Sequence, residues 1–255
     1  MYRTLAVATL IACKPPAPPW TASVVLSPAP EVVHVEEAGK RCFDVVIYAT
    51  PAEVTTITAA LHEVCVALRD PVLTQHLTAT DGLLSADDHK SVTRDGLGAN
   101  LEPTTLGNPG AWNGHGVSFY VVASSTIASS GISEICVDRN SSVRALAVSR
   151  KDRLMPSAPG KEHEAMARLV NTIAHETMHL RSKTSEEQCI DRFDDNDSNL
   201  KKCHDFTYAV GNSAACSYLA RTDGTDWQAC MVQQAALTPG FQHPERAKDE
   251  LGCDR

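Results

Sequence analysis

The pattern of hydrophobic and polar positions predicts a buried strand followed by a helix soon after residue 40. Residues 43–49 form an almost continuous apolar run, which is typical of a buried strand. Pro51 follows at a position where the first turn of a helix tolerates proline. Within residues 52–69, apolar side chains recur at helical spacing, at Val54, Ile57, Leu61, Val64, Cys65 and Leu68.

Further along the chain, three short apolar runs are followed by two helical patterns. Strands are predicted for the three runs, at residues 117–122, 132–137 and 143–148. A break rich in proline and glycine at residues 156–160 precedes a strong helical pattern, and a second helical segment begins near Asp205. We therefore expect one α+β body over residues 40–255, in which a small mixed sheet precedes the first of these two helices.

Composition and charge narrow the class of protein. Of the 255 residues, 43% are hydrophobic and 21% are charged, so the chain can bury a core and wholesale disorder is excluded. Acidic residues outnumber basic ones by 31 to 23, and no basic run occurs. Nucleic acid is therefore not an expected partner. The longest apolar stretch, near the N-terminus, is too short to span a bilayer.

The first residues have the layout of an export signal, with Arg3 followed by apolar residues and then by Cys13. The sequence Leu-Ile-Ala-Cys that ends at Cys13 resembles a bacterial lipobox. The resemblance implies a signal peptide at residues 1–12, a lipid anchor on Cys13 that binds the membrane, and sorting to the outer membrane, since residue 14 is not aspartate. An extracellular location is the other expectation for an exported chain. The alternatives are a buried first strand with an ordinary cysteine, or a cytosolic protein.

The proline-rich segment and the number of cysteines are both consistent with an exported protein. Prolines between residues 15 and 30 favour an extended chain, so residues 13–39 are expected to form a tether. Apart from Cys13, eight of the nine cysteines remain, and an even number in an exported chain suggests up to four disulfides. Cys189–Cys203 and Cys216–Cys230 are plausible local pairs. Free thiols in a cytosolic protein are the alternative.

The residues His175-Glu176-Thr177-Met178-His179 form an H-E-x-x-H sequence, which is the main functional signal. Histidines at i and i+4 project from one helix face and can bind one Zn²⁺ ion, and the glutamate lies beside that face, where it can accept a proton from the attacking water. The apolar residues of the same helix fall on the opposite side, at Met166, Leu169, Val170, Ile173 and Leu180. We therefore expect both imidazoles to face a cleft. A solvated histidine pair and a non-catalytic metal site are the alternatives.

A tetrahedral catalytic zinc needs a third protein ligand and an open fourth position. The residues after His179 lack the glycine and histidine with which a metzincin motif continues. Glu186 and Glu187 follow in a polar stretch, and Asp205 is the single acid of the next apolar helical segment, directly after His204. Each of these four residues is a possible third ligand, and a helix N-cap is an alternative role for Asp205.

The segment Asp205-Phe206-Thr207-Tyr208, downstream of H-E-x-x-H, resembles the aspzincin metallopeptidases of the deuterolysin group. The later Gly211-Asn212-Ser213-Ala214-Ala215 is also similar. The resemblance implies a zincin-like single domain with His175, His179 and Asp205 as ligands, and with Tyr208 as the hydroxyl donor to the oxyanion. It covers about residues 175–220, and the family's Gly-Thr before the aspartate and glycine after the tyrosine are absent.

Together, these features predict a secreted or envelope-anchored zinc endopeptidase that acts on peptide or protein substrates. Glu176 is the expected general base, and a strand at residues 117–122 is expected to pair with extended substrate. The competing interpretation is a non-catalytic cell-surface lipoprotein, a binding module with a structural or vestigial metal site.

Overall fold

The computed structural model describes residues 31–70, 73, 119–125, 130–138, 141–182 and 197–238 of the chain. For residues 40–41, 119, 131–138, 141–144, 179–182 and 197–206 it describes the backbone alone. Cys13, Glu186 and Glu187, about which the sequence makes predictions, lie outside the described residues. No helix in the described ranges is long and apolar enough to cross a bilayer.

Five strands form one mixed sheet in the spatial order β1-β2-β3-β5-β4. The strands are β1 (Glu31–Glu37), β2 (Lys40–Tyr48), β3 (Phe119–Ser124), β4 (Gly131–Asp138) and β5 (Ser141–Ser149). The central pairs β2–β3 and β3–β5 are parallel, and the outer pairs β1–β2 and β4–β5 are antiparallel. The predicted mixed sheet is confirmed, and β2 to β5 match the four strands expected from the apolar runs.

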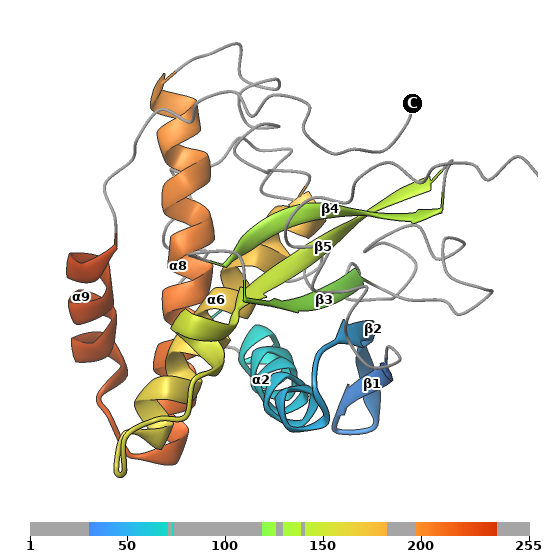
Figure 1. Cartoon of the computed structure of the whole chain (residues 1–255). Coiled ribbons are helices and arrows are strands. Elements are labelled where there is room, and N and C mark those ends of the chain that lie inside the picture. The colour runs from blue at the N-terminus through green and yellow to red at the C-terminus, as the bar shows by residue number, and fades with distance from the viewer. Residues whose placement is uncertain are drawn as a thin grey trace, which may run out of the picture.

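The helices cover one face of the sheet (Figure 1). They are α2 (Pro51–Arg69), the π-helical turn η3 (Arg150–Leu154), α6 (Glu162–Ser182), α8 (Asp197–Thr222) and α9 (Trp227–Leu237). α8 packs against α6 and α2, and α9 packs against α8 on the outside of the molecule. The α+β class and the predicted helices are therefore confirmed, whereas η3 and α9 had no counterpart in the sequence prediction.

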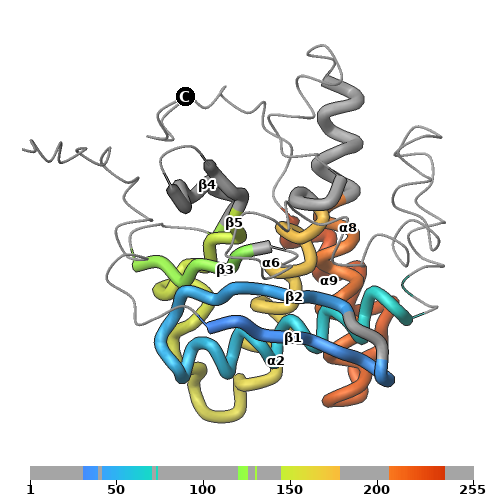
Figure 2. Tube along the Cα trace, turned by 90° about the vertical axis from the view of Figure 1, so that its right-hand side faces the viewer, coloured from blue at the N-terminus to red at the C-terminus, as the bar shows by residue number. Residues whose placement is uncertain are grey.

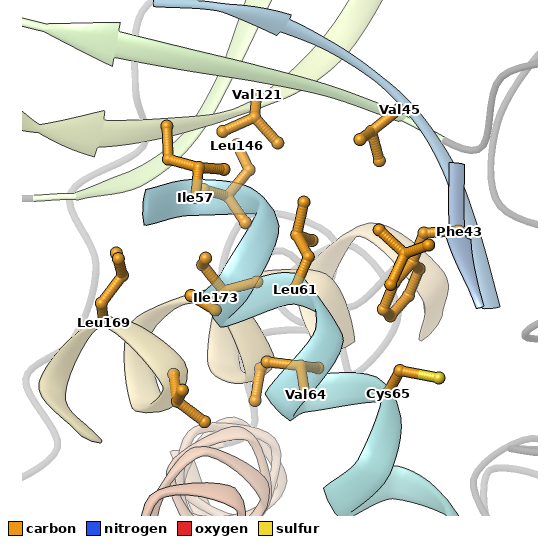
Figure 3. Close-up of a cluster of buried hydrophobic side chains, with 14 of the residues drawn as sticks. Phe43, Val45, Ile57, Leu61, Val64, Cys65, Val121, Leu146, Leu169 and Ile173 are labelled. Atoms are coloured by element: carbon orange, nitrogen blue, oxygen red, sulfur yellow. The ribbon is translucent and has the colours of Figure 1, made fainter. Parts of the chain in front are cut away.

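One hydrophobic core joins the sheet to α2 and α6. Alternate residues of β2, which are Phe43, Val45 and Ile47, point to the same side and are fully buried, as the two-residue period of a strand requires. Side chains of α2 and α6 meet them there, as Figure 3 shows for Ile57, Leu61, Val64, Leu169 and Ile173. This shared core fixes α6 on the sheet and so sets the position of the H-E-x-x-H segment.

β3 lies in the interior of the sheet, which corrects one expectation. It pairs with β2 along Phe119–Val122 on one side, and with β5 along Tyr120–Ser124 on the other. Its backbone groups are therefore used within the protein, and the prediction that residues 117–122 pair with a substrate is wrong. In the described part of the chain the two sheet edges are β1 and β4, and β4 is the edge strand that contacts α6.

β1 is a strand that the sequence analysis did not predict. It lies inside the segment assigned to the tether, so the tether boundary at residue 39 is too late. Val33 and Val35 alternate with exposed neighbours and pack into the core, and His34 is bound to the buried Asp44 across the β1–β2 pair. Figure 2 shows β1 and β2 side by side next to α2.

The turn between β1 and β2 places two residues in the left-handed region of the backbone. Ala38 has φ 50° and Gly39 has φ 72°, which is the signature of a two-residue type I′ hairpin turn. Asparagine is preferred over alanine at the first of these positions, because its short polar side chain tolerates this conformation.

Replacing Ala38 with asparagine is expected to stabilise the protein by about 1 kcal/mol, because positive φ costs alanine roughly 1–2 kcal/mol. The measurement is the midpoint of urea unfolding at an unchanged m-value. Gly39→Ala is the matched control, and it should lower the midpoint since Gly39 also has positive φ. An unchanged or lower midpoint for Ala38→Asn would contradict the turn assignment.

The start of α2 is linked to the first residue of η3, directly after β5. Thr50 Oγ1 caps the helix by accepting from the Glu53 backbone N–H, and the Glu53 carboxylate accepts from the Thr50 N–H at 2.8 Å. Arg150 donates to both carboxylate oxygens of Glu53, at 2.6 and 3.0 Å. Burial alone would raise the pKa of Glu53, but the hydrogen bonds from Arg150 and Thr50 outweigh it and hold the pKa below its usual value.

Two disulfides cross-link the described part of the chain. Cys42–Cys65 joins β2 to α2, and Cys216–Cys230 joins α8 to α9. The second is one of the local pairs predicted from the sequence, so the disulfide prediction is confirmed for it. The other predicted pair, Cys189–Cys203, lies outside the side chains that the structure describes.

Candidate metal and catalytic site

The H-E-x-x-H segment lies in the second half of α6, as the sequence predicts. The helix begins just after Gly160, which has φ 77°, and carries Glu162 and Glu164 in its first turn. Acidic side chains are favourable there because the N-terminal end of a helix is electropositive. Residues 175–179 follow on the same uninterrupted helix, so His175 and His179 lie one turn apart.

α6 is buried on more than one side. Leu169, Val170 and Ile173 pack into the core that the sheet and α2 share, which confirms the predicted apolar face for these residues. α8 covers another side of the helix, and the partly exposed His175 ring contacts Tyr208 there, with ring centroids 4.4 Å apart. His175 therefore faces α8 while part of its surface stays exposed, and the expected cleft in front of the imidazoles stays a prediction.

α6 and α8 run antiparallel, and three contacts define their register. His163 Nδ1 lies 3.1 Å from Tyr218 Oη. Asn171 Nδ2 donates to Asn212 Oδ1 at 2.9 Å. The His175–Tyr208 ring contact is the third.

The last two contacts share one spacing, because His175 follows Asn171 by four residues on α6 and Tyr208 precedes Asn212 by four residues on α8. Continuing this spacing by one turn beyond His175 predicts that residue 179 of α6 comes nearest to residue 204 of α8. We therefore predict that residue 179 lies near the turn of α8 that holds His204 and Asp205.

The position of Asp205 within α8 removes one alternative. α8 begins at Asp197, so residue 205 lies two turns inside the helix. An N-cap residue stands at the start of a helix, where free N–H groups need an acceptor. The N-cap interpretation of Asp205 is therefore wrong.

Gly211 allows the two helices to approach closely at this site. A Cβ atom at this position would lie 2.6 Å from Asn171 Oδ1, 2.9 Å from the Asn171 backbone oxygen and 3.1 Å from His175 Cβ. A side chain of any other residue therefore does not fit without moving α8. Because Tyr208 is one turn away on the same helix, this close approach is what brings its ring onto His175.

Gly211→Ala is expected to lower the free energy of unfolding by about 1–3 kcal/mol, the usual cost of overpacking. Alanine favours a helix by about 1 kcal/mol over glycine, but backbone contacts at 2.9 Å cannot be relieved by rotating a side chain. Urea unfolding measures the change.

Ser213→Ala is the control for this substitution. Within the described residues the buried Ser213 hydroxyl has no hydrogen-bond partner, so its removal should be neutral or stabilising. If Gly211→Ala unfolds at the same urea concentration as the wild type or higher, the close approach of the helices is refuted.

Glu176 is withdrawn from solvent beside the histidine face, with 8% of its surface exposed. Thr172, one turn earlier on α6, is also buried and accepts a hydrogen bond from Arg153 Nε at 2.7 Å. Arg153 belongs to η3, so this turn closes the side of α6 on which Thr172 lies. A carboxylate in such surroundings is protected from bulk water, which is the condition under which a general base acts selectively.

The donor set fits zinc by its chemistry. Two imidazoles and one carboxylate are typical zinc ligands. His175 and His179 lie one turn apart on α6, and Asp205 lies on α8, the helix that packs against it. No group of three histidine, cysteine, aspartate or glutamate side chains gathers among the residues whose side chains are described. His179, His204 and Asp205 are outside that set, so the choice of third ligand stays a prediction.

A separate hollow of about 380 Å³ lies between the start of α2, η3 and the first two turns of α6. Its walls include Leu154, Met166 and Leu169, and none of residues 175–178, the part of the H-E-x-x-H segment whose side chains are described, lines it. Leu169 lies nearly two turns before His175, so this hollow is not the candidate catalytic centre.

Sequence reasoning missed the contribution of Asn171 and Asn212. Asn171 precedes His175 by one turn, which places it on the histidine face of α6. This spacing is the sequence signal by which Asn171 could have been identified as a neighbour of the site. Asn212 stands in the segment that resembles the aspzincins, next to Gly211. The contact between the two amides could not be found without the register of the helices.

No protein-family model, no curated protein and no solved structure matches this chain.

Proposed function

We propose that the protein is a zinc-dependent endopeptidase whose catalytic centre lies between α6 and α8. The observation that carries the proposal is the antiparallel register of the two helices. It places His175 against Tyr208. Its continuation by one turn supports a position of His179 near His204 and Asp205. Two imidazoles, a carboxylate and a buried glutamate are the residues that zinc peptide hydrolysis requires.

In this proposal His175, His179 and Asp205 hold the metal. The two histidines share one face of α6, and the aspartate comes from the neighbouring helix, so the ligands approach from two rigid elements. When bound, zinc polarises the substrate carbonyl and lowers the pKa of the attacking water. The class closest in pattern is the aspzincin group of zincin-like metallopeptidases.

Glu176 is the proposed general base. It accepts a proton from the water that attacks the scissile carbonyl, and then delivers that proton to the nitrogen of the leaving amine. The peptide C–N bond breaks as the amine leaves, so one water molecule is consumed for each bond cleaved. The low exposure of Glu176 keeps competing solvent away from this proton transfer.

Tyr208 is the proposed hydroxyl donor to the oxyanion that develops during the attack. Its ring lies against His175, with centroids 4.4 Å apart, and it is partly exposed, so substrate can reach it. A fixed phenol that donates to developing charge stabilises the transition state more than the ground state.

The edge strand β4 is the proposed site for an extended peptide substrate. β4 is antiparallel to β5 and contacts α6, and it pairs with no second strand among the described residues. An extended peptide can add to such an edge through main-chain hydrogen bonds.

We further propose that the enzyme works in the cell envelope or outside the cell, held by a lipid on Cys13. The two disulfides agree with an oxidising compartment, where such bonds persist. An outer-membrane location follows from the lipobox resemblance.

The test begins with the metal content of the purified protein. Each chain should carry one zinc ion, and a mixed peptide library should yield new N-terminal amines in mass spectra. A chelator should stop cleavage, and added zinc should restore it. Protein that binds no zinc would refute the proposal, and zinc-loaded protein that cleaves nothing would favour the binding-module alternative.

A further inference from the structure

We propose that Asn212 is a positioning residue, which together with Asn171 and Thr238 holds Tyr208 and Asp205 in register with the histidines of α6. This inference rests on the proposed function. It assigns to α9, through Thr238, a part in shaping the metal site.

A directed chain of hydrogen bonds links three helices through Asn212. Asn171 Nδ2 on α6 donates to Asn212 Oδ1 at 2.9 Å. Asn212 Nδ2 donates in turn to Thr238 Oγ1 at 3.0 Å, and that hydroxyl donates to the Gln234 carbonyl at 3.0 Å. Asn212 is only 6% exposed, so its amide is bound on both sides and cannot turn to water.

The chain lies directly beside the candidate site. Asn171 and His175 lie on successive turns of one face of α6, and His179 lies on the next turn of the same face. Asn212 and Tyr208 are successive turns of α8, with Asp205 three residues further toward its start. The Asn171–Asn212 bond therefore fixes the register one turn away from the His175–Tyr208 contact.

α9 braces the opposite side of α8. The Cys216–Cys230 disulfide attaches one part of α9, and Thr238, the C-cap residue of α9, attaches its end to Asn212. Cys216 and Asn212 are one turn apart on α8, so two links converge on a short stretch of that helix. Asn212 is thus held between α6 and α9, and it cannot shift unless one of the two contacts breaks.

The consequence for the site is geometric. Gly211 leaves no side chain between the helices at this point, so the directed Asn171–Asn212 contact adds to the apolar packing between α6 and α8 in opposing a slide of α8. Residues that orient ligands without touching the metal affect zinc affinity by about 10- to 100-fold. Loss of the Asn212 amide should weaken zinc binding within that range.

The experiment compares four variants of the full chain. Asn212→Ala removes the central amide, and Thr238→Val removes only the hydroxyl, with little change in shape. Thr238→Ser keeps the hydroxyl and should behave as wild type. Ser217→Ala is the matched control, because it removes a hydrogen bond between the buried Ser217 on α8 and Asp70, at 3.1 Å, away from the histidine face.

Three measurements read the outcome. Chelator competition gives the zinc affinity, and the visible spectrum of the cobalt-substituted protein reports ligand geometry. In metal-free protein, the nuclear Overhauser effect between the His175 and Tyr208 rings reports their contact directly. Asn212→Ala and Thr238→Val should weaken zinc binding about 10- to 100-fold, alter the cobalt spectrum and lose the Overhauser effect. Thr238→Ser and Ser217→Ala should change none of these.

The two proposals fail in different ways. If wild-type protein takes up no metal, the proposed function is refuted, and the Overhauser effects in metal-free protein still decide the positioning role. If Asn212→Ala keeps the ring contact, the positioning role is overturned. If Ser217→Ala loses as much zinc affinity as Asn212→Ala, the effect is general destabilisation of α8 and the inference is also overturned.

Discussion

Replacing Glu176 with glutamine is expected to lower the rate of peptide cleavage by about 100- to 10,000-fold, the range that a general base contributes. Glutamine has the size of glutamate and fills the same buried space, so the fold should be kept. Its amide cannot accept a proton at neutral pH, so the attacking water loses its base. Zinc content should stay at one ion per chain, because Glu176 is not a proposed ligand.

Glu164→Gln is the matched control for this substitution. Glu164 lies in the first turn of the same helix, its side chain is 52% exposed and it is paired with Lys161. Because exposed ion pairs contribute little, this variant should cleave at the wild-type rate. Cleavage by Glu176→Gln at the wild-type rate would refute the role of Glu176, and loss of zinc from this variant would show that the carboxylate acts as a ligand instead.

The helices that carry the site could be predicted because their apolar residues recur with the helical period. The core residues of α6, such as Leu169 and Ile173, define one face, and the H-E-x-x-H histidines necessarily fall elsewhere. What covers the remaining faces depends on the partners of the helix. The sequence therefore could not show that α8 packs against the side of α6 on which His175 lies.

Register and sheet order could not be read from the sequence for a related reason. The α6–α8 register depends on a close approach at Gly211, and a glycine within a helix does not reveal which atoms lie opposite. Likewise, the apolar run of β3 predicts a strand but does not show that β2 and β5 flank it on both sides. β1 was missed because the prolines before it dominated the interpretation of residues 13–39, although Val33 and Val35 alternate as in a strand.

The α6–α8 register also bears on which residue is favoured as the third zinc ligand. From the sequence alone, Asp205 competed with His204, Glu186 and Glu187. Continuing the register of the Asn171–Asn212 and His175–Tyr208 contacts by one turn favours the turn of α8 that holds His204 and Asp205. Within that turn, Asp205 is three residues from Tyr208, the spacing of neighbours on one helix face, and Tyr208 contacts His175.

Asp205→Asn is therefore expected to weaken zinc binding by at least about 100-fold and to abolish cleavage when zinc is limiting. Loss of a group outside the first coordination sphere already costs about 10- to 100-fold, and a lost ligand costs more. Asparagine keeps the shape of the side chain but removes the charge that balances the cation. Chelator competition measures the affinity, and circular dichroism checks that α8 is still helical.

Three control substitutions decide whether Asp205 is the ligand. Glu186→Gln, Glu187→Gln and His204→Ala should each bind zinc as tightly as the wild type, because a tetrahedral catalytic centre takes only three protein ligands. If one of these variants loses zinc while Asp205→Asn retains it, the third ligand is that residue. The α6–α8 register would then bring Tyr208 to His175 without supplying a ligand from α8, or would supply it through His204.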